Sequence, residues 1–213
     1  MNIKKRNILI SIILILLSII FTILIKLIDV QPIGIDGTSI GFATINKSIF
    51  DYTKVNLIWY HITDYLGIIT IFIVIIYTLI GLIQLIKRKN IFKVDKEIII
   101  LGLFYITIIL IYIFFEKVII NYRPILIDNI KEASYPSSHT LMTICICISS
   151  IIVNKKTYNN KITKITNILS LIIMIITVIG RLISGVHWFT DIIGGIIISS
   201  SLLMTLYTII NYK

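Results

Sequence analysis

The chain has 213 residues, 57% of them hydrophobic, with a formal net charge of +10 and a mean hydropathy of +1.01. A soluble domain of this length could not bury so much apolar surface, so the composition excludes a soluble globular protein. The positive charge alone would suit a nucleic-acid-binding protein, but the positions of the charged residues decide between the classes.

Six apolar runs are long enough, or nearly long enough, to cross a bilayer as helices. They cover residues 7–27, 67–86, 97–115, 139–153, 165–183 and 191–210. The fourth run is short, which indicates a helix that extends beyond it or tilts. The first follows a basic segment but is too long for the apolar region of a signal peptide, and no small-residue cleavage site follows it. We therefore predict an all-α fold, with a retained first helix and a single membrane domain of six transmembrane helices over residues 1–213.

Basic residues gather in four segments that all fall on one side of a six-helix chain: the amino terminus, the second loop, the fourth loop and the carboxyl terminus. They are Lys4, Lys5, Arg6, Lys87, Arg88, Lys89, Lys93, Lys96, Lys155, Lys156, Lys161, Lys164 and Lys213. The positive-inside rule makes this side cytoplasmic, with both termini in the cytoplasm of a cell-membrane protein. Anionic lipid headgroups suffice as partners for these loops, so we expect no nucleic-acid partner. The sequence carries no signal for an oligomeric state.

The opposite side carries most of the acidic residues and the longest loop, residues 28–66. Ile45, Ile49 and Phe50 lie at helical spacing between polar residues, which indicates an amphipathic helix in the membrane interface. Two interpretations of this loop remain open. It could be a surface loop that caps the bundle, or it could be a lid over a site or a wall of a substrate entrance.

The fourth apolar run opens with Pro136-Ser137-Ser138-His139. Serine is a preferred N-cap residue, and the free N–H groups of a first helical turn, with the helix dipole, bind anions. The backbone near Ser137 and Ser138 could therefore hold phosphate oxygens, with His139 directed at a leaving-group oxygen. Taken alone, the motif also fits an ordinary helix cap beside an interfacial histidine.

A second motif, Arg181-x5-His187-x3-Asp191, joins the fifth and sixth runs. On a helix, His187 and Asp191 share a face, and a carboxylate behind an imidazole fixes its tautomer, leaving the other nitrogen free to attack phosphorus. Arg181 lies at the membrane boundary, where a charge is costly without a partner. A snorkelling arginine with a structural His–Asp pair is the alternative interpretation.

A third motif, Lys117-x5-Arg123-Pro124, follows the third run. A guanidinium can grip two phosphate oxygens, and a lysine adds a point charge. Because basic residues are common where a membrane helix ends, this motif alone is weak evidence.

Together the three motifs resemble the type 2 phosphatidic acid phosphatase superfamily, also called lipid phosphate phosphatases. The pattern of that family is Lys-x6-Arg-Pro, then Pro-Ser-Gly-His, then Ser-Arg-x5-His-x3-Asp, on a six-helix bundle in its membrane members. The resemblance implies that His187 is the nucleophile that forms a phosphohistidine, that Asp191 orients it, and that His139 is the general acid. It also implies a phosphate cradle formed by Lys117, Arg123, Arg181 and the backbone of Ser137 and Ser138.

Three residues depart from the family pattern. Five residues rather than six separate Lys117 from Arg123, and one residue rotates a helical position by about 100°. Ser138 stands where the family has glycine, and a serine would be strained there if the backbone adopted a conformation open only to glycine. Gly180 replaces the serine before Arg181 and removes a possible hydroxyl contact.

Two further features are interpreted structurally. His61, with Asp64 three residues later, is taken as an interfacial histidine outside the site. Gly194 and Gly195 are expected to let the sixth membrane helix pack closely against a neighbour.

The leading hypothesis is an integral-membrane hydrolase of a lipid phosphate or lipid diphosphate, with its site on the extracytoplasmic side. Undecaprenyl diphosphate, phosphatidylglycerophosphate and phosphatidate are the candidate substrates, and the outward site favours the polyprenyl carrier by analogy. We expect no cofactor and no metal, because the cations come from the protein itself. The alternatives are a non-enzymatic protein that binds or transports an anionic lipid with the same pocket, and a haloperoxidase that holds vanadate there.

Overall fold

The computed structural model describes residues 2–158 and 160–212, which fold into a bundle of helices. Within these residues, six helices are long and apolar enough to cross a membrane: α1 (Ile3–Ile25), α3 (Leu57–Arg88), α4 (Lys96–Lys117), α5 (Ser138–Val153), α6 (Lys161–Ile183) and α7 (Phe189–Ile210). The shorter elements are α2 (Ala43–Thr53), the 3-10 turns η1 (Ile35–Gly37) and η2 (Ile91–Lys93), and the π-helical turn η3 (Asn154–Tyr158). The predicted all-α, six-helix membrane fold is confirmed.

Two of the membrane helices extend furthest beyond their predicted ranges. α3 starts at Leu57 rather than at residue 67, because the side chain of Asn56 accepts hydrogen bonds from the N–H groups of Ile58 and Trp59 and caps the helix there. The early start places His61 and Asp64 on α3. The short fourth run is extended by η3, giving a continuous helical span of 21 residues, which is long enough to cross a bilayer.

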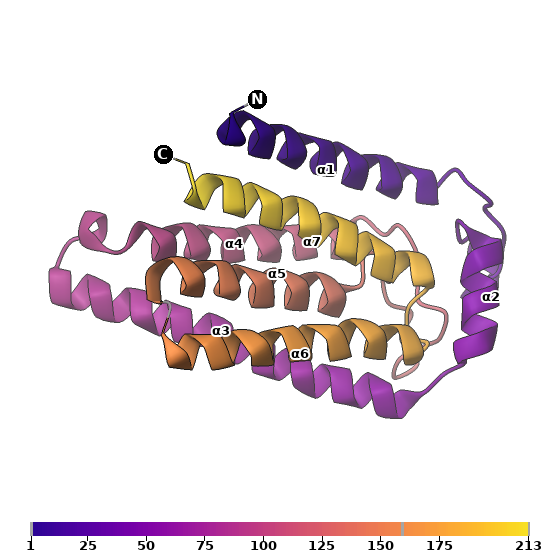
Figure 1. Ribbon diagram of the computed structural model, residues 1–213. Helices are drawn as coiled ribbons and strands as arrows, with labels where there is room; N and C mark the ends of the chain where they lie inside the picture. Colours follow the sequence, from indigo (N-terminus) through magenta and orange to yellow (C-terminus); the bar gives the residue numbers. More distant parts are fainter. Residues whose placement is uncertain (1, 159, 213) are drawn as a thin grey trace.

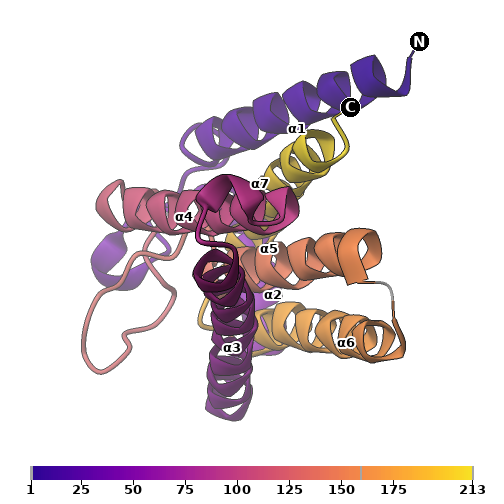
Figure 2. The same ribbon diagram turned by 90° about the vertical axis from the view of Figure 1, so that its left-hand side faces the viewer.

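α5 is the central helix of the bundle and packs against α3, α4, α6 and α7 (Figures 1 and 2). In the most apolar 18-residue stretch of the α5 span, 61% is buried and the mean hydropathy is 1.3. In the corresponding stretch of α1, 11% is buried and the mean hydropathy is 3.3. A helix enclosed by protein need not be soluble in lipid, so α5 can carry small polar residues that allow close helix packing. Its buried polar residues are Thr140, Thr143, Ser149 and Ser150.

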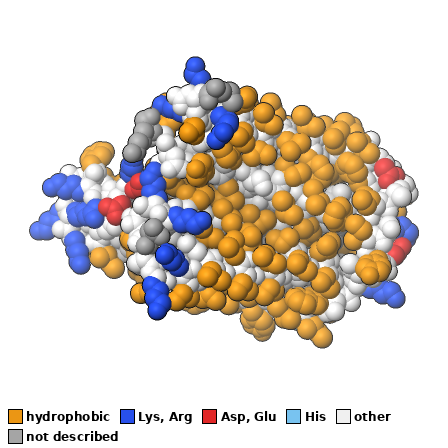
Figure 3. Space-filling view, viewed as in Figure 1, with side chains coloured by type: hydrophobic (Ala, Val, Ile, Leu, Met, Phe, Trp, Pro, Cys, Tyr) orange, Lys and Arg blue, Asp and Glu red, His pale blue; other side chains and the backbone are white. Residues whose placement is uncertain are grey.

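The two ends of the bundle differ in charge and content. Both termini and the α3–α4 and α5–α6 connections lie at one end (Figure 1), where lysine and arginine side chains gather on the visible surface (Figure 3). α2 and the α4–α5 and α6–α7 connections lie at the opposite end (Figure 1). The predicted placement of the basic segments on one side is therefore confirmed for the described residues, and Lys213 lies outside them. The three motifs occupy the other end.

α2 lies across the ends of the membrane helices (Figure 1) and is fixed there by Asn46, which is completely buried. The Asn46 side chain accepts a hydrogen bond from the N–H of Thr190 at 3.0 Å. It also donates to Thr190 Oγ1 at 2.9 Å and to the carbonyl of Gly41 at 2.8 Å. The predicted amphipathic helix is thus present, and its bonds to the start of α7 attach it to the end of the bundle as a cap.

Candidate active site

His187 lies in the short connection between α6 and α7, and its tautomer follows from its hydrogen bonds. Its Nδ1 is 3.1 Å from the carbonyl oxygen of Ser134 and 3.1 Å from Ser134 Oγ. A carbonyl can only accept, so Nδ1 carries the proton. Nε2 then holds a lone pair, and this buried atom has no hydrogen-bond partner among the described residues. It is the atom that could act as a nucleophile.

The surroundings of His187 favour its neutral form. Burial lowers the pKa of His187 well below its usual range, and the positive charges of Arg123 and Arg181 lower it further. A neutral imidazole keeps the Nε2 lone pair at neutral pH, which nucleophilic attack requires.

Asp191 supports His187 through an intermediate group, which corrects the expectation that the carboxylate lies directly behind the imidazole. Ser134 Oγ donates a hydrogen bond to Asp191 Oδ2, so the hydroxyl oxygen is left to accept from His187 Nδ1. Asp191 also accepts hydrogen bonds from the N–H of Trp188 at 2.9 Å and from Asn121 Nδ2 at 3.3 Å. The sequence prediction missed Ser134 and Asn121, because the α4–α5 connection contributes both.

The backbone around His187 is fixed by a close approach of two connections. Gly185 has φ +67°, and a Cβ there would lie 2.1 Å from the carbonyl oxygen of Lys54. Only glycine fits this position without strain. The N–H of Asn56 donates to the carbonyl of Ser184 at 3.0 Å. The turn that carries His187 is therefore attached to the α2–α3 connection.

The start of α5 provides part of the predicted anion site. The N–H groups of Ser138, His139 and Thr140 belong to the first turn, where helical N–H groups have no intrahelical partner. The N–H of Ser137 instead donates to the carbonyl of Asp191 at 3.0 Å, so this one backbone donor is already paired. The contact of Ser137 with phosphate stays a prediction. Ser138 adopts the helical conformation as the first residue of α5, which explains why serine can replace glycine there.

Gly194 and Gly195 bring the start of α7 against the α5 region, as predicted. A Cβ at Gly194 would lie 2.1 Å from the ring of Tyr135, and one at Gly195 would lie 3.0 Å from the Thr140 side chain. This close packing lets Asp191 reach both Ser137 and Ser134.

The two arginines of the motifs each have one nitrogen paired with a carboxylate. Arg181 is fully buried near the end of α6, where its Nη2 pairs with Asp64 and its guanidinium lies 5.0 Å from the centre of the Tyr60 ring. Arg123 lies on the hairpin-like α4–α5 connection, and its Nη2 is 3.1 Å from Glu132 Oε2. Nε and Nη1 of both arginines are buried without a hydrogen-bond partner among the described residues.

Unpartnered buried polar atoms are concentrated in the motif residues. Of thirteen such side-chain atoms among the described residues, seven belong to Arg123, Ser137, His139, Arg181 and His187. A buried polar group without a partner is costly. Their concentration around one histidine indicates a site built for a polar ligand, and four guanidinium nitrogens select an oxyanion.

Lys117 is the predicted site residue that the structure does not bring into this group. It is exposed in the last turn of α4, and its side chain makes no hydrogen bond or ion pair with any described residue. The spacing of five residues to Arg123 agrees with this displaced position. Its contact with phosphate stays a prediction.

Asp64 is a residue that the sequence prediction left out. Its Oδ1 pairs with Arg181 and lies 3.1 Å from His139 Nε2. His61, one helical turn earlier, is exposed and its ring contacts that of Tyr60. The placement of His61 outside this cluster agrees with the prediction.

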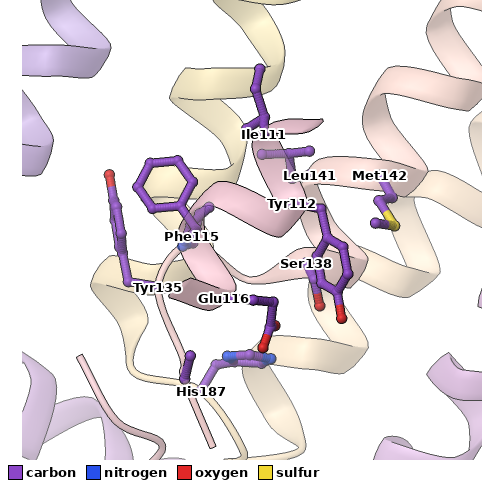
Figure 4. Close-up of a pocket in the computed structure, with 11 residues that line it drawn as sticks. Ile111, Tyr112, Phe115, Glu116, Tyr135, Ser138, Leu141, Met142 and His187 are labelled. Carbon is purple, nitrogen blue, oxygen red and sulfur yellow. The ribbon is translucent and has the colours of Figure 1, made fainter. Parts of the chain in front are cut away.

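Two adjoining pockets open at the site. One pocket is lined by residues of α4, of α5 and of the α4–α5 and α6–α7 connections. In it, Glu116 and His187 point toward one another across the opening (Figure 4). The other is lined by Asp64, His139 and mostly apolar residues of α3 and α5. Tyr112, Ser138 and Met142 line both pockets. Within the part of the chain that the structure describes, no three His, Cys, Asp or Glu side chains are grouped to hold a metal ion.

Comparison with known proteins places the chain in a family. The model of the PAP2 superfamily matches residues 98–213. This is more than half of the chain and contains all three motifs, so the chain belongs to the PAP2 superfamily. Membership supports the hydrolysis of a phosphoric ester and, for a membrane-spanning chain, of a lipid phosphate in general.

A solved structure shares the fold. The chain is similar to a structure described as the first transmembrane PAP2 type phosphatidylglycerolphosphate phosphatase from Bacillus subtilis, with 17% sequence identity and a TM-score of 0.66. The match covers 95% of this chain and 98% of the other. It shows that the two proteins have the same transmembrane architecture. No curated protein sequence matches the chain.

Proposed function

We propose that the protein hydrolyses a lipid phosphate or lipid diphosphate through a phosphohistidine intermediate on His187. The observation that carries this proposal is the state of His187 Nε2, which is buried and unpartnered. The Nδ1–H contacts to Ser134 leave this atom with its lone pair. A neutral nucleophile among guanidinium groups suits an attack on an anionic phosphorus centre.

The reaction would proceed in two displacements. In the first, Nε2 of His187 forms a bond to phosphorus, the P–O bond to the lipid breaks, and His139 gives a proton to the departing oxygen. In the second, water attacks the phosphohistidine, the N–P bond breaks, and His139 takes the proton of the water. Arg123 and Arg181 would stabilise the charge on the phosphoryl oxygens in both steps.

The groove beside the site supports a lipid substrate. It has a volume of about 350 Å³, with Asp64, Ser138 and His139 among its polar members. Its apolar members come from α3 and α5: Ile68, Ile71, Met142 and Ile146. A phosphate at the polar members would leave an acyl or prenyl tail beside the apolar ones. Undecaprenyl diphosphate, phosphatidylglycerophosphate and phosphatidate all have this form, and an outward site favours the polyprenyl diphosphate by analogy.

We also propose that the site faces the extracytoplasmic side of the cell membrane, with both termini in the cytoplasm. The support is the basic surface at the opposite end (Figure 3) and the positive-inside rule. A reporter that works only in the cytoplasm should be active when fused after Lys156 and inactive when fused near Asn129. The reverse pattern would place the site in the cytoplasm.

The activity itself is tested by phosphate release from a panel of lipid monophosphates and diphosphates by the purified, detergent-solubilised protein. The proposal predicts release from at least one lipid by the wild type and none by His187→Ala. Binding of the lipids without any release would favour the non-enzymatic lipid-binding alternative. Ser201→Ala is a suitable control, because the hydroxyl of this buried serine on α7 bonds only to the carbonyl of Ile198 among the described residues.

A further inference from the structure

Asp64 connects two residues of different motifs while belonging to none of the motifs. A single oxygen, Oδ1, pairs with Nη2 of Arg181 and lies 3.1 Å from Nε2 of His139. A carboxylate oxygen accepts from both donors, so this atom has the charge and hydrogen-bonding role of a phosphate oxygen in the same place. Arg181 has 0% and Asp64 35% of its side chain exposed, so the carboxylate lies at the open side of the arginine.

Two glycines bring α3 close enough to place this carboxylate. A Cβ at Gly180, the residue before Arg181, would lie 2.5 Å from Thr63 Cγ2 and 3.0 Å from the Trp59 ring. A Cβ at Gly67 would lie 3.1 Å from the His139 ring. Real Cβ atoms essentially never lie as close as 2.5 Å to a neighbouring side chain, and the contact at Gly67 would be tighter than most, so a side chain at either position would push α3 away from α6 or α5. Gly180 stands where the family pattern has serine, so this departure coincides with the approach of Asp64.

We propose that Asp64 is a resident anion of the phosphate site, which competes with bound phosphate for Arg181 and His139. The inference rests on the proposed function for the identity of the ligand. A phosphate that binds Arg181 through Nη2 must displace the carboxylate from that nitrogen. The carboxylate also repels a phosphate anion that binds through the free Nε and Nη1.

In a phosphatase, this competition would favour release of the product. Inorganic phosphate is the product that remains in the cradle after the phosphohistidine is hydrolysed. Arg123 and Arg181 would hold it tightly if their charges were uncompensated. A resident carboxylate lowers the affinity for free phosphate, while the lipid substrate gains additional binding from its tail. Asp64 thus favours release of the product over retention.

The test is the affinity of the full-length protein for inorganic phosphate and vanadate, measured by calorimetry in detergent. Asp64→Asn keeps the size of the side chain and removes its charge. We expect it to bind both anions at least about fivefold more tightly than the wild type, the factor for two unit charges about 4 Å apart even in water. A role limited to structural support would instead leave the affinity unchanged or weaken it.

The matched control is Asp51→Asn, which removes the same charge from an exposed residue of α2 that pairs with Lys47 at 3.8 Å. Its phosphate affinity should equal that of the wild type. Asp64→Glu keeps the charge and should also bind phosphate weakly. Unchanged or weaker binding by Asp64→Asn would overturn the inference.

Folding of the variants is itself informative, because phosphate should take the place of the missing carboxylate on Arg181. Asp64→Asn is therefore purified in phosphate, and Asp64→Ser serves as a second variant with the same expected tightening. Failure of both to fold in phosphate would contradict the inference. If the wild type releases no phosphate from any lipid but Asp64→Asn still binds phosphate more tightly, the proposed activity fails and the resident anion stands.

Discussion

Removal of the Ser134 hydroxyl tests whether it carries the effect of Asp191 to His187. In Ser134→Ala, the carbonyl oxygen of residue 134 still accepts from Nδ1 of His187, so the tautomer is retained. Asp191 keeps its bonds from the N–H of Trp188 and from Asn121. The variant therefore loses the bridge alone, and we expect the enzyme to fold and to turn over more slowly.

The size of the loss follows from the bond that is removed. A hydrogen bond to a charged acceptor contributes about 1.5–3 kcal/mol. If this stabilisation acts on the imidazolium character that develops as Nε2 bonds to phosphorus, kcat falls about 10- to 150-fold, at about 1.4 kcal/mol for each factor of ten. Asp191→Asn should cost at least as much, because it also changes the acceptor that orients the Ser134 hydroxyl.

The assay is single-turnover hydrolysis of a lipid phosphate, with thermal unfolding in detergent to confirm folding. Ser201→Ala removes a buried serine hydroxyl from α7 without touching the site and should keep wild-type kcat. The informative variant is the double substitution of Ser134→Ala and Asp191→Asn. If Asp191 acts through Ser134, the double variant should be nearly as slow as Asp191→Asn. Losses that multiply would show that the two residues act independently and would refute the bridge.

Three other predictions address the chemistry of the site. Activity should survive excess EDTA and be inhibited by vanadate, which mimics five-coordinate phosphorus, whereas loss on chelation that magnesium restores would contradict a cradle of protein cations. His139→Ala should lose about 10²–10⁴-fold on a lipid phosphate, where the alkoxide needs a proton, and much less on an aryl phosphate. Equal losses would exclude His139 as the acid. Because the pKa of His187 is lowered in the fold, its contribution to stability is complete above its unfolded pKa of about 6.5 and is lost as the pH falls below it. The midpoint of thermal unfolding should therefore decrease as the pH is lowered from about 7.5 to about 5.5. The decrease should be smaller in His187→Gln.

The bundle was predictable because its signals are local. An apolar run of sufficient length indicates a membrane helix wherever the helix lies, so all six were found. The starting point of α3 was not, since Asn56 caps the helix in a polar segment well before the apolar run. The central position of α5 is visible in retrospect in its lower hydropathy and its many serine and threonine residues.

The site was partly predictable for the same reason. His139, Arg123, Arg181, His187 and Asp191 lie in motifs of fixed spacing, and the structure gathers them around one end of the bundle. Ser134 and Asn121 could not be found, because a serine two residues before a proline has no recognisable spacing to Asp191. Their contacts arise when the α4–α5 connection meets the start of α7. Asp64 was missed because residue 64 was expected in a loop rather than on α3.

The central claim is that His187 carries the phosphoryl group, and chemical trapping tests it most directly. The purified protein is incubated with a lipid phosphate labelled at phosphorus, quenched in alkali and digested, and the labelled peptide is identified by mass spectrometry. We predict alkali-stable label on the peptide that contains His187 in the wild type, and none in His187→Ala. Label that persists in His187→Ala, or turnover by that variant, would contradict the account.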